Sequence, residues 1–285
     1  MRHKPFVTLV ICALAVSACG DRSDEAEVQR ALKDINVIDE ANLNEVMMSA
    51  ADPAEAVAYF RRTATQNPDR PELKRGLARS LVRAKQPAEA AGIWAQVADG
   101  PGGTPEDRVE LAGALIRAGD WTGAKAQLDR IPPTVETYER YKLEAMVADS
   151  KGDWTRADSF YETAAGLTLK PAGILNNWGY SKLSRGDYAA AERLFARALS
   201  HDGSLFTAKN NLVLARGSQG NYDLPVVKMT QIEKAQLLHT LALAAIKRGD
   251  VATGRSLLEE AVETHPQHFE PAARALAALD ANVTN

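Results

Sequence analysis

The sequence predicts an all-α solenoid, in which helix–turn–helix units stack side by side. A Gly-Asp-aromatic pattern recurs in the strings RAGDWTGA, SKGDWTRA and SRGDYAAA, and the related string SQGNY follows them. The glycines are Gly119, Gly152, Gly186 and Gly220, at spacings of 33, 34 and 34 residues. Three alanines keep the same 34-residue spacing: Ala56, Ala90 and Ala124. Self-similarity at a fixed period of this length indicates a repeat architecture. Aromatic residues make up only 6% of the chain, which favours closely packed helices over sheets.

The residue types within one unit explain how each helix pair forms. In the unit that begins near Ala172, Gly186 ends the first helix, because glycine readily adopts the positive φ of that position. Tyr188 then opens a second helix with the spacing A-x₃-F-x₂-A, in which small residues let helices approach and large ones fill the gaps. The equivalent positions along the chain are Ala56-Phe60-Thr63, Ala90-Trp94-Val97, Ala124-Leu128-Ile131, Ala157-Tyr161-Ala164, Ala191-Phe195-Ala198 and Gly254-Leu258-Ala261. This pattern is typical of the tetratricopeptide repeat (TPR), and we assign residues 37–220 to a TPR array.

The N-terminal residues have the features of a lipoprotein signal peptide. A basic start, Arg2 to Lys4, precedes an uncharged and almost entirely apolar run of 13 residues, from Phe6 to Ala18. A membrane-spanning helix needs about 20 residues, so the run is too short to span a bilayer and has the length of a signal-peptide core. The small residues before Cys19 resemble the lipobox of bacterial lipoproteins. We therefore expect removal of residues 1–18 and lipid on Cys19, which would anchor the chain to a membrane.

The chain that remains after such a cleavage is mildly acidic. Residues 1–18 contain two basic side chains and no acidic one, so 267 residues remain with 32 basic and 37 acidic side chains and a formal charge of −5. This charge argues against a nucleic-acid partner. We expect residues 19–36 to form a tether and an N-terminal cap helix, with Val28, Ala31, Leu32 and Ile35 on one helical face.

The repeat pattern breaks in residues 221–234. Pro225 stands where the next second helix would run, and proline breaks a helix interior. Thr230 and Glu233 form a capping-box pattern that predicts a new helix from this point. The segment is either a decayed repeat or an apolar notch for a partner. The notch residues would be Leu224, Val226 and Val227. Residues 235–285 are assigned to a last TPR unit and a capping helix.

Motifs for chemistry are absent from the sequence. It contains no H-E-x-x-H, P-loop or G-x-S-x-G pattern, and we predict that the protein is not an enzyme and has no cofactor. His265 and His268 flank a proline turn without an evident third ligand, so we predict no metal site there.

Protein binding is the better prospect, because TPR arrays present an extended concave wall built from their first helices. We expect two asparagine pairs 34 residues apart and a tyrosine on this wall: Asn176, Asn177, Tyr180, Asn210 and Asn211. Amides both donate and accept, so they suit a peptide backbone; alternatively, they bond neighbouring helix ends. A second candidate is a basic face on one first helix, which would meet an acidic partner or lipid headgroups or would simply be solvated: Arg75, Arg79 and Arg83.

The lysine clamp with which chaperone-binding TPR proteins hold a terminal carboxylate is incomplete here. Lys142 and Asn177 match two of its positions. The other positions are held by Met146, Thr207 and Asn211.

A lipobox followed by about six such units resembles the TPR lipoproteins of bacterial envelopes. Within that class, the strings NNWGYSKLSRGDYAAAERLFARAL, NNLVLARGSQGNY and LPVVKMTQ resemble the TadD family of the tight-adherence (Flp) pilus system. The resemblance implies an outer-membrane lipoprotein facing the periplasm, with a secretin or another pilus-assembly component as its partner. The alternative is another envelope scaffold, such as a type IV pilotin or a factor for outer-membrane protein insertion or cell-wall synthesis.

Overall fold

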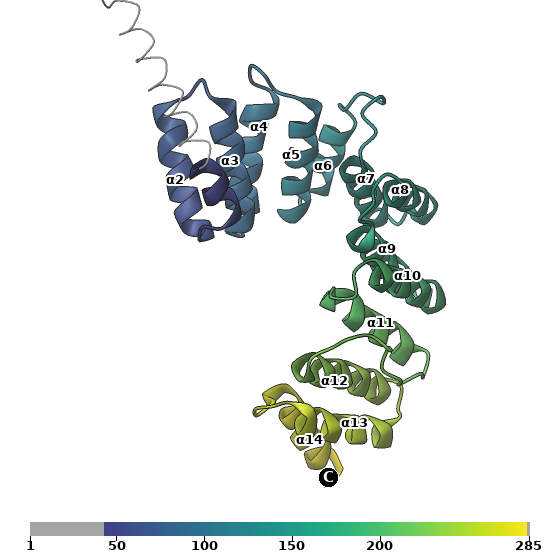
Figure 1. The fold of residues 1–285 in the computed structure, drawn as a ribbon. Coiled ribbons are helices and arrows are strands. Elements are labelled where there is room, and N and C mark those ends of the chain that lie inside the picture. Colours follow the sequence, from purple (N-terminus) through teal and green to yellow (C-terminus); the bar gives the residue numbers. More distant parts are fainter. Residues whose placement is uncertain (1–42, 284–285) are drawn as a thin grey trace, which may run out of the picture.

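The computed structural model describes residues 43–283, which form a curved row of antiparallel helices (Figure 1). A short helical stretch at residues 43–49 precedes the helices labelled in Figure 1. Those helices are α2 (Pro53–Gln66), α3 (Pro71–Arg83), α4 (Pro87–Ala98), α5 (Pro105–Arg117), α6 (Trp121–Leu128), α7 (Tyr138–Ser150), α8 (Trp154–Gly166), α9 (Ala172–Ser184), α10 (Tyr188–His201), α11 (Phe206–Ser218), α12 (Gln231–Lys247), α13 (Val251–Thr264) and α14 (Glu270–Val283). No strand occurs among them, so the predicted all-α solenoid is confirmed. The signal peptide, Cys19 and the expected cap helix lie outside the described residues.

The repeated Gly-Asp dipeptide sets the turn between the two helices of a unit. Each of its glycines has a positive φ: Gly119, Gly152, Gly186 and Gly249. The aspartate that follows caps the second helix by accepting a backbone N–H, as Asp187 does from Ala190 in α10. In the earlier turn between α3 and α4, Lys85 takes the same left-handed conformation, with φ 59°.

Small residues on one helix receive large residues from the next. Phe195 of α10 is fully buried, and its ring lies over Gly179 of α9, so closely that a Cβ at residue 179 would be 2.6 Å from the ring. Phe60 of α2 meets Gly76 of α3 in the same way. The core is therefore a succession of small clusters between neighbouring helices, as expected for a solenoid.

The repeat is interrupted between α11 and α12. Residues 221–230 contain no helix, and α12 begins at Gln231, inside the 221–234 segment, with the predicted capping box of Thr230 and Glu233. Because α11 lacks a second helix, it packs directly on α12, where a Cβ at Gly217 would be 2.7 Å from that of Ala244. Between residues 43 and 283, no helix is both long and apolar enough to cross a membrane.

Candidate functional site

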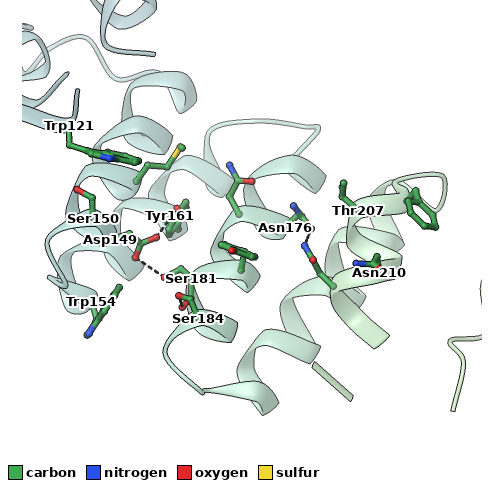
Figure 2. A pocket seen from close by; sticks show the side chains of 15 residues that line it. Trp121, Asp149, Ser150, Trp154, Tyr161, Asn176, Ser181, Ser184, Thr207 and Asn210 are labelled. Carbon is green, nitrogen blue, oxygen red and sulfur yellow. Dashed lines mark hydrogen bonds between the residues drawn. The ribbon is translucent and has the colours of Figure 1, made fainter. Parts of the chain in front are cut away.

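A groove of about 530 Å³ runs across the first helices of three consecutive units (Figure 2). Two tryptophans from the starts of α6 and α8 border it, together with the buried Tyr161 of α8. The residues on the first helices are Met146, Asp149 and Ser150 of α7, Asn176, Asn177, Tyr180, Ser181 and Ser184 of α9, and Phe206, Thr207, Asn210 and Asn211 of α11. Every wall residue expected from the sequence therefore lies in one groove.

The asparagines are oriented by bonds between helices. Asn211 of α11 donates to Asn176 Oδ1 of α9 over 3.1 Å, and Thr240 of α12 donates to Asn210 Oδ1 over 2.7 Å. These contacts engage the oxygens of Asn176 and Asn210, and within residues 43–283 both amide nitrogens remain without an acceptor. Within residues 43–283, the amide of Asn177 has no hydrogen-bond partner and faces the same space. Bonds to neighbouring helices, one of the two expected roles, occur at Asn176, Asn210 and Asn211, whereas binding of a peptide backbone stays a prediction.

Asp149 lies half-buried at the end of α7, inside the groove. Its Oδ1 accepts a hydrogen bond from Ser181 over 2.7 Å, and its Oδ2 accepts one from Tyr161 over 3.0 Å. Burial raises the pKa of Asp149 above its ordinary value, and the two hydroxyl donors oppose this only in part. The carboxylate is thus held in place by neutral donors.

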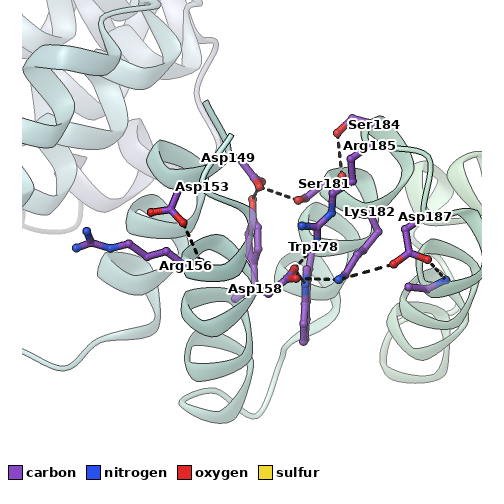
Figure 3. Close-up of polar contacts among 12 residues, drawn as sticks. Asp149, Asp153, Arg156, Asp158, Trp178, Ser181, Lys182, Ser184, Arg185 and Asp187 are labelled. Atoms are coloured by element: carbon purple, nitrogen blue, oxygen red, sulfur yellow. Dashed lines mark hydrogen bonds and ion pairs between the residues drawn. The ribbon is translucent and has the colours of Figure 1, made fainter. Parts of the chain in front are cut away.

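A neighbouring carboxylate, Asp158 of α8, has a different environment (Figure 3). It accepts from Trp178 Nε1 over 2.6 Å, from Lys182 Nζ over 2.8 Å and from the Arg185 guanidinium. Burial opposes its ionisation, but these hydrogen bonds and the charge of Arg185 outweigh burial and lower its pKa. The Trp178 ring also stacks on Tyr161, with centroids 6.4 Å apart. The network joins α8 to α9 next to the groove.

Lysine and arginine are absent from the groove lining. Lys142, which matched a position of the carboxylate clamp, lines a separate cavity of about 310 Å³ between α5 and α7. Burial lowers the pKa of Lys142, and the charge of Arg117 lowers it further. The groove therefore lacks the cations that a terminal carboxylate would need.

The three arginines of α3 do not form a free basic face, which corrects the expectation from their spacing. Arg75 makes a two-pronged pair with the buried Asp107 of α5, at 2.7 and 2.8 Å. Arg79 lies 3.5 Å from Glu110, and both side chains are about half exposed. Arg83 donates to three backbone carbonyls of the short helical stretch at residues 43–49 and the turn after it. Spacing placed the arginines on one face, but α5 supplies acids to Arg75 and Arg79, and backbone carbonyls engage Arg83.

The expected apolar notch is present in part. A cavity of about 530 Å³ lies at the broken repeat, and Val227 and Met229 line it; binding of a partner there stays a prediction. Leu224 packs against the clusters around α12 and α13, and Val227 packs against the cluster of α10 and α11. Only Val226 is fully exposed. The buried Lys209 of α11 holds residues 221–234 in place, because it donates to the carbonyl of Lys228 over 2.8 Å and to Glu233 over 3.1 Å.

Among the groove residues that reasoning from sequence missed, three matter most for binding: Trp121, Trp154 and Asp149. Trp121 and Trp154 occur in the Gly-Asp-Trp strings, where they served only to define the period; they are 36% and 40% exposed. An exposed tryptophan directly after a capping aspartate was the available signal. Asp149 stands in the last turn of its helix, where a carboxylate looks like ordinary solvated surface.

Comparisons with known proteins agree with the fold. Residues 47–99 match the tetratricopeptide repeat family model. A solved TPR protein from Parabacteroides merdae superposes with a TM-score of 0.54 at 12% identity, over 83% of this chain and 95% of that one. The fold is a TPR solenoid. The C-terminal part of a TPR repeat-containing protein from Cytophaga hutchinsonii resembles this TPR solenoid with a TM-score of 0.50 at 13% identity, over 81% and 97% of the two chains.

A larger assembly contains a similar solenoid. The crystal structure of the APC/C hetero-tetramer Cut9–Hcn1 matches with a TM-score of 0.59 at 13% identity, over 82% of this chain. The match covers 47% of that chain, so this TPR solenoid spans about half the length of its counterpart. No curated protein sequence matches the chain.

Proposed function

We propose that this TPR solenoid is a non-catalytic, membrane-anchored scaffold that helps to assemble or localise a bacterial pilus or secretion apparatus. TPR arrays are protein-interaction scaffolds with extended binding surfaces. The observation that carries the proposal is the convergence of exposed aromatic rings and unused amides in one groove across α7, α9 and α11. Such a surface suits an extended segment of a protein partner, because rings contact its side chains and amides bond its backbone.

The anchor in this proposal is lipid on Cys19. The lipobox-like border at Cys19 supports it, and several acyl chains at about 0.8 kcal/mol per buried CH₂ hold a protein firmly on a membrane. We place the protein in the bacterial cell envelope, on the outer membrane and facing the periplasm. The resemblance to the TadD family favours a secretin of a tight-adherence pilus as the partner.

Photo-crosslinking in the native host tests this function. A photoreactive amino acid replaces Tyr180, which lies in the groove and is 59% exposed. The matched control carries it at Val226, which is fully exposed but outside the groove. We expect Tyr180 to capture a pilus secretin or another pilus-assembly protein, and the control to capture none. Capture of a barrel-insertion or cell-wall protein would replace the pilus assignment, and adducts at Val226 alone would show that the groove is not the working surface.

A further inference from the structure

Asp149 differs from the other buried carboxylates of the array in its partners. Asp107 is paired with Arg75, and Asp158 with Lys182 and Arg185. Within residues 43–283, Asp149 has no ion-pair partner; it accepts only from two buried hydroxyls, those of Ser181 and Tyr161. Arg185 acts on it from a distance, but that guanidinium is bonded to Asp158.

The surroundings of Asp149 favour a positively charged guest. It is the sole charged residue of the groove lining, which contains no lysine or arginine. Trp121 and Trp154 line the same groove with partly exposed rings, as the close-up shows (Figure 2). Tryptophan rings attract cations; Arg185 already lies 5.4 Å from the centroid of the Trp154 ring, so Trp121 is the ring available to a guest. A hydrogen bond between two ionised groups is about twice as strong as one between neutral groups. A lysine or arginine side chain would supply the counter-charge that the fold omits.

The amides that line the same groove suit a peptide backbone. Asn176 and Asn210 line the groove, and within residues 43–283 their amide nitrogens make no hydrogen bond, whereas their oxygens are bonded to neighbouring helices. Asn177 offers both a donor and an acceptor. A peptide backbone has the same alternation of N–H and C=O groups.

We propose that the groove holds an extended segment of a protein partner whose lysine or arginine side chain pairs with Asp149. This inference rests on the proposed function and adds the chemistry of the partner. The other residues of the segment are basic or uncharged, because the groove lining has no lysine or arginine to pair with an acidic residue.

A peptide selection tests the pairing. The full-length chain, purified in detergent, selects from a library of short C-amidated peptides of random sequence, and the bound pool is sequenced. We expect basic residues to be enriched at one fixed position. Asp149→Asn keeps the shape of the side chain, and we expect it to lower that enrichment about tenfold, the effect of one charged hydrogen bond. The control Asp153→Asn changes an exposed helix cap outside the groove into another good cap, so the enrichment should stay unchanged.

A second variant keeps the test informative if Asp149→Asn unfolds. Asn177→Asp adds a carboxylate at a side chain without internal bonds, and we expect it to raise the enrichment of basic residues. Enrichment that ignores the charge at residue 149, or selection of acidic peptides, would overturn the pairing and leave the groove as a binding site. Absence of enrichment with every protein would overturn the pairing and remove peptide binding by the groove as well. Self-association of the chain that Asp149→Asn abolishes would make a second copy the occupant.

The crosslinking experiment at Tyr180 separates the two proposals. A captured pilus protein whose joined segment lacks lysine and arginine would support the proposed function and refute the pairing with Asp149. Capture of a segment with a basic residue supports both.

Discussion

Gly179→Ala is a sharp test of the packing between α9 and α10. Gly179 is buried, and a Cβ there would lie 2.6 Å from Cε1 and 2.8 Å from Cδ1 of Phe195. Carbon atoms in contact prefer about 3.5–4.0 Å, so the ring would have to move by about 1 Å. Phe195 is fully buried in the cluster of α9, α10 and α11, so the ring can move only by displacing its neighbours.

Two effects of opposite sign decide the stability of Gly179→Ala. Overpacking a filled core costs about 1–3 kcal/mol. Alanine is the better helix former by about 1 kcal/mol. We therefore expect the free energy of unfolding to fall by about 1 kcal/mol, the difference between these effects. Gly92→Ala in α4 is the matched control, because no atom lies within 4 Å of its added Cβ. It should gain about 1 kcal/mol from helix propensity alone.

Urea unfolding followed by far-ultraviolet circular dichroism measures both changes. The packing argument is refuted if Gly179→Ala stabilises the protein as much as Gly92→Ala does. Phe195→Leu supplies a further check, because it shortens the side chain that meets the new methyl group. In the double variant, the cost of Gly179→Ala should shrink, with a coupling energy of about 0.5–3 kcal/mol between these touching residues.

Three further predictions concern other parts of the chain. Lys85→Gly should raise the free energy of unfolding by about 1 kcal/mol. Lys85 has a φ of 59°, and left-handed backbone costs an L-residue about 1–2 kcal/mol; glycine avoids this cost but loses more backbone entropy on folding, which cancels part of the gain. An unchanged urea midpoint would contradict this. Asp107→Asn should destabilise by about 2 kcal/mol at neutral pH, since it breaks the pair with Arg75. Burial opposes ionisation of Asp107, but hydrogen bonds and the charge of Arg75 lower its pKa. The stability from this pair is therefore present above the ordinary pKa of 3.8 and is lost as pH falls through the lowered pKa. In urea titrations, the difference in free energy of unfolding between wild type and variant should shrink in that range. Cys19→Ser should move the protein from the membrane fraction to the soluble one, and a variant that stays in the membrane fraction would contradict lipidation as the anchor.

The fold was predictable because every unit of a solenoid makes the same helix contacts and therefore needs the same residue types at the same positions. Each unit needs a left-handed residue between its helices and small residues where they cross, so Gly186 and Ala191 mark the unit in the sequence itself. Lys85 shows the limit of that signal, because the same backbone conformation occurs there without a glycine. The break after α11 was visible from Pro225, whereas the packing of Leu224 and Val227 depends on contacts with helices outside the segment.

The site was predictable only where its residues follow the period. The two asparagine pairs stand 34 residues apart on first helices, so the fold brings them together. Asp149 was not predictable, because its importance comes from having no ion-pair partner within residues 43–283. That in turn depends on Arg185 bonding to Asp158. Arg75 failed as a binding candidate for the related reason that its partner, Asp107, lies one repeat further along the chain. Periodicity gives the position of a side chain, and the neighbouring units decide whether it is free.

The missing second helix also sets the length of whatever the groove recognises. The asparagine series stops after Asn211, because the equivalent positions of the next first helix, ten and nine residues before Gly249, are His239 and Thr240. Three first helices at spacings of about 8–10 Å give a footprint on the order of 20 Å. An extended chain covers that length with about six residues, at about 3.3 Å each. The solenoid would thus recognise a short linear motif. Adding those few residues to an exposed tail of another protein would be enough for binding, and deleting them from a partner would abolish it.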